Sequence, residues 1–198
     1  MKKILAINGS YREGGITDQA VDQMVRAAES TGAEVEVIRL RGYPIEFCCN
    51  CRQCTQACGE APGQCVLQDE MASLIDKIEQ ADAYILASPT NLGSVTALYK
   101  RFMERLTVYA YWPWGKPFPK HRKAGMPKKK AVLISSCAAP GLFGRLLYGT
   151  HKQLKMTANI IGAEPVGSLF TGLISAEQHK VLPEAVQKKA QALAAKLV

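Results

Sequence analysis

The sequence predicts an α/β protein built around a parallel sheet of five strands. Short apolar runs rich in β-branched residues alternate with longer segments that have a helical pattern. This alternation is typical of βαβ units, in which a crossover helix returns the chain to the next parallel strand. The chain has 198 residues, so it can bury a large core without disulfides, and we expect a single domain over 1–198.

The composition of each apolar run indicates its place in the sheet. The runs at 2–8, 82–88 and 130–136 are mostly apolar, as strands are when helices cover both faces of a sheet. The run at 33–40 alternates apolar and polar residues, which suits an edge strand. The run at 164–172 completes the predicted sheet.

Helical segments follow the expected strands. The segment at 17–32 places five apolar residues on one helical face: Ala20, Val21, Met24, Val25 and Ala28. Gly32 suits a helix C-cap, and Pro183 suits the first turn of the last helix. The expected helices cover 17–32, 69–80, 94–110, 144–162 and 183–197. Two long insertions, 41–68 and 109–129, interrupt the alternation.

Composition and the N-terminal residues indicate the expected cellular compartment. Hydrophobic residues make up 47% of the chain, but no apolar run reaches the roughly 20 residues that span a membrane. The opening "MKKILAINGS" lacks the longer apolar region and the cleavage site of an export signal. We therefore expect a cytoplasmic protein with reduced thiols and no membrane partner.

The formal net charge of +8 suggests acidic partners or ligands. Much of the excess lies in the segment 115–130. This segment is either a solvated loop or a docking surface for an acidic electron-transfer protein or an anionic cofactor. No DNA- or RNA-binding motif accompanies the basic run, so we expect no nucleic-acid partner.

The loop after the first expected strand has the residues of an anion site. Open α/β sheets bind ligands beyond the carboxyl ends of their strands, where "NGSYREGGIT" (8–17) leads into a helix. Its backbone amides, the helix dipole and the hydroxyls of Ser10 and Thr17 favour an anion. Arg12 can make a forked contact to a phosphate. The alternative is an ordinary β-to-α turn with a threonine cap and a solvent-exposed arginine.

Two further loops at the same edge leave room for a planar group. In "SPTNLGSV" (88–95), Pro89 disfavours helix at Ser88, and Gly93 permits a close backbone approach. The loop "SSCAAPG" (135–141) consists of small residues. The first loop matches neither the nucleoside-triphosphate motif nor the dinucleotide motif. The three loops together predict a flat cofactor with a phosphate tail.

The two motifs "GSYREGGIT" and "ASPTNLGSVTALYKRFMERL" resemble those of the NADPH-dependent FMN reductase family of flavodoxin-like proteins. That family carries G-S-x-R-x-x-x-x-T after the first strand and, after the third, S-P-x-Y and then, beyond eight intervening residues, K-x-x-x-D-R. The resemblance implies a three-layer sandwich with strand order 2-1-3-4-5. It also implies FMN as cofactor, NAD(P)H as co-substrate, and a homodimer or homotetramer.

By this resemblance, the phosphate of FMN would be held by the first loop and the ring would be bordered by the second. The predicted cofactor-binding residues are Ser10, Arg12, Gly15, Ile16, Thr17, Pro89, Thr90, Asn91, Leu92, Gly93 and Ser136. Ser136 belongs to the third loop, which would face the pyrimidine side of the ring. No side chain is predicted to be catalytic, because the flavin would carry the chemistry.

Two positions depart from the family pattern. Asn91 stands where the family usually has an aromatic residue. The aromatic residues in and around the second insertion are candidates to cover the ring instead, or to form a hydrophobic interface: Tyr109, Tyr111, Trp112 and Trp114. Glu104 replaces the usual aspartate before Arg105, and we interpret Glu104 and Arg105 as a structural pair.

Six of the seven cysteines lie in "FCCNCRQCTQACGEAPGQC" (47–65). Cys48, Cys51 and Cys54 form C-x2-C-x2-C, a spacing that can wrap one side of a [4Fe–4S] cluster. Cys65 is the candidate for the fourth ligand, and Cys58 is its competitor. The arrangement resembles the iron–sulfur flavoprotein branch of the same family, in which an acidic helix start follows the cysteines.

Two other interpretations of the cysteines stay open. Four thiolates could bind zinc, although zinc sites normally use two separated pairs of cysteines. The thiols could also hold no metal. Cys49 is spare in every case, and Cys137 is interpreted as a small buried residue.

The sequence thus predicts an FMN-dependent oxidoreductase that takes hydride from NAD(P)H. It would pass electrons to a small-molecule or protein acceptor, directly or through an iron–sulfur cluster. One alternative is a ferredoxin-linked iron–sulfur flavoprotein that acts as an electron carrier. An alternative of another class is a zinc-binding assembly protein.

Overall fold

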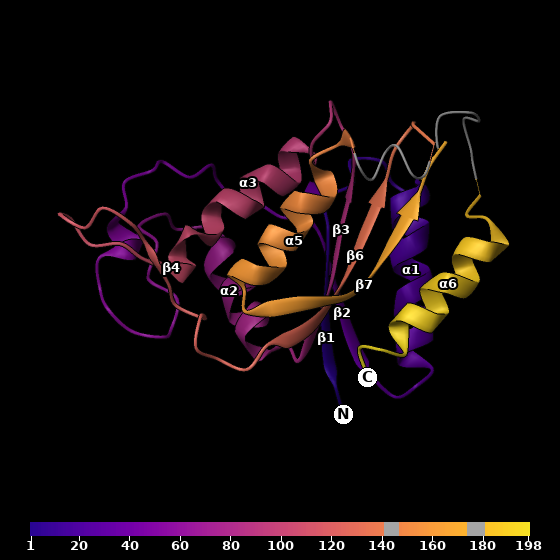
Figure 1. The fold of residues 1–198 in the computed structure, drawn as a ribbon, viewed down its shortest axis with the longest axis horizontal. Helices are drawn as coiled ribbons and strands as arrows, with labels where there is room; N and C mark the ends of the chain where they lie inside the picture. Colours follow the sequence, from indigo (N-terminus) through magenta and orange to yellow (C-terminus); the bar gives the residue numbers. More distant parts are fainter. Residues whose placement is uncertain (141–146, 174–180) are drawn as a thin grey trace.

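A computed structural model describes residues 1–140, 147–173 and 181–198. Five parallel strands form the central sheet in the order β2-β1-β3-β6-β7 (Figure 1). The strands are β1 (Lys3–Asn8), β2 (Glu34–Arg39), β3 (Ala83–Pro89), β6 (Lys129–Ser136) and β7 (Ala163–Thr171). This is the predicted 2-1-3-4-5 order, so the predicted flavodoxin-like fold is confirmed, with β2 at an edge.

Helices cover both faces of the sheet and make it the middle of three layers (Figure 1). One face carries α1 (Ile16–Glu29) and α6 (Glu184–Ala194), and the other carries α2 (Met71–Gln80), α3 (Ala97–Arg105) and α5 (Thr150–Ile160). Alternate residues of a strand point to opposite faces. Leu5 and Ile7 of β1 therefore enter one core, and Ile4 and Ala6 enter the other.

The bounds of two helices, α3 and α5, differ from the predicted helices by more than a residue or two at their starts. The side chain of Thr96 accepts a hydrogen bond from the Tyr99 amide and caps α3, so this helix starts at Ala97 rather than at 94. Helix α5 runs from Thr150 to Ile160, so the described residues Tyr148 and Gly149 of the predicted helix 144–162 lie outside it. Residues 144–146 of that predicted helix lie outside the described part of the chain.

The turn from β1 into the predicted anion loop is packed tightly against α3. The amide of Gly9 donates to the Ala87 carbonyl (2.8 Å), and the Thr96 hydroxyl donates to the Gly9 carbonyl (2.6 Å). A Cβ atom at position 9 would lie 2.7 Å from the Cβ of Tyr99. Only glycine therefore fits at the junction between β1 and this loop.

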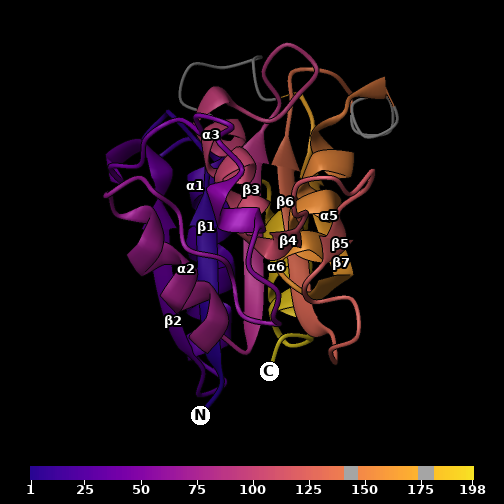
Figure 2. The same ribbon diagram turned by 90° about the vertical axis from the view of Figure 1, so that its left-hand side faces the viewer.

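The two insertions pack against each other and extend beyond the sheet at one end of the molecule, which faces the viewer in Figure 2. The second insertion contains a short hairpin, β4 (Ala110–Tyr111) and β5 (Lys120–His121). Buried Arg122 donates to the carbonyls of Cys54, Ala57 and Gly59 in the first insertion. Arg122, within the basic segment 115–130, is thus a structural clamp, and the two interpretations of the exposed part of that segment stay predictions.

An ion pair closes the base of the cysteine-rich insertion. Arg105, at the end of α3, binds both carboxylate oxygens of Asp69 at 2.6 and 3.0 Å. Asp69 also accepts from the amides of Glu46 (2.6 Å) and Met71 (3.0 Å). These bonds join the residues on either side of the loop and keep its ends together.

Arg105 has the predicted structural role, but its ion-pair partner is Asp69 and not Glu104. Glu104 instead lies 3.4 Å from Lys100 on the exposed face of α3. Consecutive residues of a helix point in different directions, so Arg105 faces inward, where its side chain is 1% exposed and that of Asp69 is 8% exposed.

Replacing Gly9 by alanine tests the packing of β1 against α3. We expect Gly9→Ala to lower the free energy of unfolding by about 1–3 kcal/mol, because the new methyl group overpacks the contact with Tyr99. The control is Gly42→Ala, where a Cβ atom meets nothing within 4 Å. Urea unfolding measures both variants, and equal stabilities would contradict the contact.

The ion pair predicts a dependence of stability on pH. Burial raises the pKa of Asp69, but the hydrogen bonds from Arg105, Glu46 and Met71 outweigh it and hold that pKa below its ordinary value of 3.8. A carboxyl group with a depressed folded pKa stabilises fully above its unfolded pKa and loses that contribution as the pH falls through the folded one.

We therefore expect Asp69→Asn to lower the free energy of unfolding by roughly 3 kcal/mol at pH 7. The difference in free energy of unfolding between this variant and the original protein should narrow as the pH falls toward 3. The matched control is Asp22→Asn, because Asp22 pairs with Arg39 on the surface, where a pair contributes at most about 1 kcal/mol. A gap that stays constant with pH in urea unfolding would contradict the prediction.

Candidate functional site

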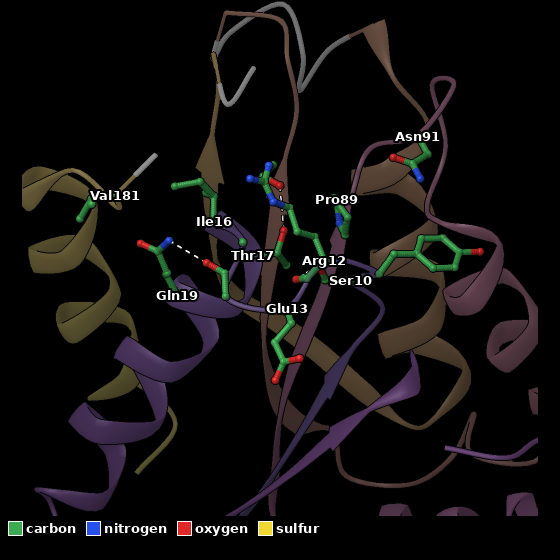
Figure 3. A pocket seen from close by; sticks show the side chains of 13 residues that line it. Ser10, Arg12, Glu13, Ile16, Thr17, Gln19, Pro89, Asn91 and Val181 are labelled. Atoms are coloured by element: carbon green, nitrogen blue, oxygen red, sulfur yellow. Dashed lines mark hydrogen bonds between the residues drawn. The ribbon is translucent and has the colours of Figure 1, made fainter. Parts of the chain in front are cut away.

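A cavity of about 320 Å³ lies at the carboxyl edge of the sheet, where the predicted loops meet (Figure 3). Eight of the eleven predicted cofactor-binding residues line it: Ser10, Arg12, Gly15, Ile16, Thr17, Pro89, Asn91 and Ser136. Thr90, Leu92 and Gly93 are not among its lining residues. Tyr11, Glu13, Gly14, Gln19 and Val181 line it without having been predicted.

The first loop is held in shape by its own polar groups. The Ser10 amide donates to the side-chain oxygen of Asn8 (2.9 Å), and the Arg12 amide donates to the Ser10 hydroxyl (3.2 Å). The Ser10 hydroxyl in turn donates to the Arg12 carbonyl (3.1 Å). These bonds fix the backbone of the loop before any ligand binds.

A buried carboxylate supports the loop from below. Asp18 is 2% exposed. It accepts from the side-chain amide of Asn8 (2.6 Å), from the Gly14 backbone (3.1 Å) and from Arg41 (2.9 Å). Arg41 comes from the segment after β2 and offsets the negative charge of Asp18 beneath the predicted anion loop. Sequence reasoning missed both residues, although an acid in the first turn of a helix that follows a glycine-rich loop was a visible signal.

The N-terminus of α1 opens onto the cavity. The first amides of a helix have no acceptor within the helix. Among the described residues, no side chain caps α1 at Gly15. The hydroxyls of Thr17 and Ser136 are 2.8 Å apart and join the start of α1 to the end of β6. Together with Ser10 and Arg12, which flank this N-terminus in Figure 3, these groups fit a phosphate.

The second loop forms a tight turn at the other side of the cavity. The amides of Asn91 and Ser94 donate to each other's carbonyls at 2.9 and 3.0 Å. Leu92 and Gly93 between them have φ of +47° and +76°, the left-handed region that leucine rarely adopts. The turn carries Leu92 at its tip, fully exposed, while Asn91 borders the cavity.

Helix α5 anchors this turn. The amide of Gly149 donates to the Gly93 carbonyl (2.7 Å). The side-chain oxygen of Gln153 accepts from the Ser94 hydroxyl and from the Val95 amide, both at 2.9 Å. The turn is therefore attached to the helix layer, which keeps its position relative to the first loop fixed.

The aromatic residues proposed to cover the ring lie elsewhere in the described chain. Tyr109 is fully buried in a core cluster and donates to Glu79 (2.9 Å). Trp112 and Trp114 stack on the guanidinium of Arg52, which lies 3.8 and 4.3 Å from their ring centroids. These residues, like Tyr111, do not line the cavity, so the chain itself supplies Tyr11 as the aromatic residue of its lining.

Five of the seven cysteines line a second, small cavity of about 20 Å³: Cys48, Cys49, Cys51, Cys54 and Cys65. Burial, together with the nearby thiols of Cys65, Cys48 and Cys51, raises the pKa of the Cys54 thiol to about 11. The Cys54 thiol therefore lies within electrostatic reach of the other three predicted ligands. A positive ion or a cluster would relieve this mutual repulsion of thiolates.

Backbone geometry explains why these thiols converge. Asn50 and Arg52, between the first three cysteines, have φ of +53° and +60°, and such left-handed residues turn the chain sharply. Gly63 packs so closely that a Cβ atom there would lie 1.8 Å from the Cys54 carbonyl oxygen. This close approach brings Cys65 back to Cys54, which spacing alone did not reveal.

The remaining thiols lie apart from this group. Cys58 is exposed and does not line the small cavity, whereas Cys137 is buried, as predicted, and donates to the Ala139 carbonyl (3.3 Å). All seven cysteines are free in the part of the chain that is described. In that part, no group of three or more His, Cys, Asp or Glu side chains has the arrangement required to hold a single metal ion.

Comparisons with known proteins agree with this fold. A crystal structure of an FMN-dependent NADH-azoreductase from Bacillus anthracis in complex with FMN superposes with a TM-score of 0.70 and 16% identity, covering 100% of this chain and 99% of that one. An NAD(P)H:quinone oxidoreductase from Methanothermobacter marburgensis gives 0.69 and 14%, covering 98% and 96%. No helix in the described ranges is both long and apolar enough to cross a membrane.

Curated relatives match part of the chain. An iron–sulfur flavoprotein of Archaeoglobus fulgidus is 35% identical over 111 residues, which are 56% of this chain and 48% of that protein. An iron–sulfur flavoprotein of Methanocaldococcus jannaschii is 32% identical over 103 residues, 52% of this chain and 51% of that protein. The chain thus spans about half the length of the curated relatives it matches.

The profile of the NADPH-dependent FMN reductase family matches residues 2–171. This range contains β1 to β7 and every residue of the two cavities except Val181. The match therefore covers the sheet, the anion loop and the cysteine-rich insertion together. The chain belongs to the NADPH-dependent FMN reductase family.

Proposed function

We propose that this protein is an FMN-dependent oxidoreductase that takes hydride from NAD(P)H and passes the electrons to an acceptor. The observation that carries the proposal is the uncapped N-terminus of α1, which opens with Ser10, Arg12 and Thr17 onto a cavity at the carboxyl edge of the sheet. The donor set suits a phosphate monoester better than a longer polyphosphate, because Lys side chains of a P-loop are missing from the loop sequence.

Each part of the cavity has a distinct proposed task. The loop from Ser10 to Thr17 would hold the phosphate, with Arg12 supplying the positive charge. Pro89 and Asn91 would border the ring, and Ser136, tied to Thr17, would keep the third strand end in register with the first loop. Bound FMN would supply the redox chemistry, accepting a hydride and releasing electrons singly or as a pair. The chain's own residues bind and orient it.

We propose further that Cys48, Cys51, Cys54 and Cys65 hold a [4Fe–4S] cluster. Their convergence on one small cavity supports this, as do the names of the curated relatives. The alternative to the oxidoreductase is an electron carrier, a ferredoxin-linked iron–sulfur flavoprotein. Three further points stay predictions: the class of the final acceptor, protein or small molecule, the oligomeric state and the compartment.

Replacing Arg12 by alanine tests the phosphate site. We expect the Kd for FMN to rise about 10- to 100-fold, because a charge-assisted hydrogen bond contributes about 1.5–3 kcal/mol. Quenching of flavin fluorescence on titration measures the Kd. Riboflavin, which lacks the phosphate, should bind the variant and the original protein equally.

Arg26→Ala is the matched control, because Arg26 lies in the last turn of the same helix, far from the cavity. It should leave both affinities unchanged. If Arg12→Ala weakens FMN and riboflavin alike, Arg12 does not contact the phosphate. An unchanged FMN affinity in Arg12→Ala would contradict the assignment of the first loop as the phosphate site.

The identity of the fourth cluster ligand is tested by paired serine variants. After anaerobic purification, we expect the original protein to show flavin bands with a broad brown absorbance and to contain iron and sulfide. Cys65→Ser should lose most of the iron, whereas Cys58→Ser should keep it, because Cys58 is exposed and lies outside the small cavity.

The same preparations decide between the interpretations of the cysteines. Zinc in place of iron, with a colourless protein, would support the zinc-binding assembly protein and overturn both proposals. Flavin bands without metal would leave the oxidoreductase standing and remove the cluster. Loss of iron in Cys58→Ser but not in Cys65→Ser would identify Cys58, and not Cys65, as the fourth ligand.

A further inference from the structure

We propose that Arg105 is a positioning residue that raises the reduction potential of the cluster by donating a hydrogen bond to the sulfur of Cys65. This inference rests on the proposed [4Fe–4S] site. It adds that the buried pair of Arg105 and Asp69 sets how readily that site accepts an electron.

The guanidinium of Arg105 is aimed at the sulfur by fixed partners. Its Nη2 lies 3.4 Å from the Sγ of Cys65 and 3.0 Å from Oδ1 of Asp69. Its Nη1 donates to Oδ2 of Asp69 (2.6 Å) and to the Glu46 carbonyl (2.9 Å). With four contacts and a side chain only 1% exposed, the guanidinium cannot rotate away from Cys65 without breaking the base of the loop.

The charge of this group acts directly on the ligand. One-electron reduction of a cluster adds one negative charge, which is shared with the thiolate sulfurs. A donor N–H on such a sulfur stabilises the reduced state more than the oxidised one and so raises the potential. Little solvent screens the effect here, because Arg105 and Asp69 are both buried.

Asp69 works in the opposite direction. Its carboxylate offsets part of the positive charge of Arg105 and lowers the potential relative to an unpaired guanidinium. The two residues are therefore expected to have effects of opposite sign. Simple loosening of the loop would move both variants in the same direction, so the signs separate an electrostatic role from a structural one.

The test is a redox titration of the anaerobically reconstituted protein, followed by the electron paramagnetic resonance of the reduced cluster. We expect Arg105→Lys to lower the equilibrium constant for one-electron reduction about tenfold, equivalent to about 59 mV, because the ammonium group cannot hold Asp69 and Cys65 together. We expect Asp69→Asn to shift the potential upward. Thermal unfolding followed by circular dichroism checks that each variant is folded.

Arg122→Lys is the matched control. Arg122 is also a buried arginine that clamps the cysteine loop, but its described contacts there are to backbone carbonyls and not to sulfur. It should leave the potential unchanged. If Arg105→Lys does not fold, Asp69→Asn measured against Arg122→Lys still decides the question through the sign of its shift.

The outcomes are distinct. Shifts of opposite sign for Arg105→Lys and Asp69→Asn support the inference. Potentials equal to that of the original protein, or shifts of the same sign, overturn it while the cluster assignment stands. If the original protein takes up no cluster when iron and sulfide are supplied, the cluster assignment fails and this inference fails with it.

Discussion

The parallel direction of the five strands is the constraint on which the rest of the structure depends. Because every crossover returns the chain to the same end of the sheet, the carboxyl ends of β1, β3 and β6 lie side by side and their loops meet. Each loop lines the cavity from its place at the end of its own strand and does not have to reach across the molecule. Asp18, Thr96 and Gln153 then lock each loop to the helix that follows it or packs on it.

Helix α3 connects the two candidate sites. Its N-cap, Thr96, donates to the Gly9 carbonyl beside the anion loop, and its last residue, Arg105, holds Asp69 and Cys65. Nine residues of helix span only about 13 Å. The cavity at the carboxyl edge and the cysteine loop are thus held by contacts at opposite ends of one helix.

The sheet and the cavity could be predicted largely from the sequence because their signals are local. Apolar runs, hydroxyls and glycines next to strand ends are visible within ten residues of sequence. The sheet order agrees with the structure, and eight of the predicted cofactor-binding residues line one cavity. The partners of Arg105 and Arg122 could not be predicted. Each pairs with groups more than thirty residues away, so only the packing of the two insertions determines which charge meets which acceptor.

The stacking of Trp112 and Trp114 on Arg52 has an optical consequence. These are the two tryptophans of the chain, and both indoles sit against the same residue between Cys51 and Cys54. Intrinsic emission excited near the red edge of protein absorption therefore originates at a single place, and it reports the state of the cysteine segment rather than of the sheet. The molecule carries its own local fluorophore for the one region where a coloured inorganic centre would act as an energy acceptor.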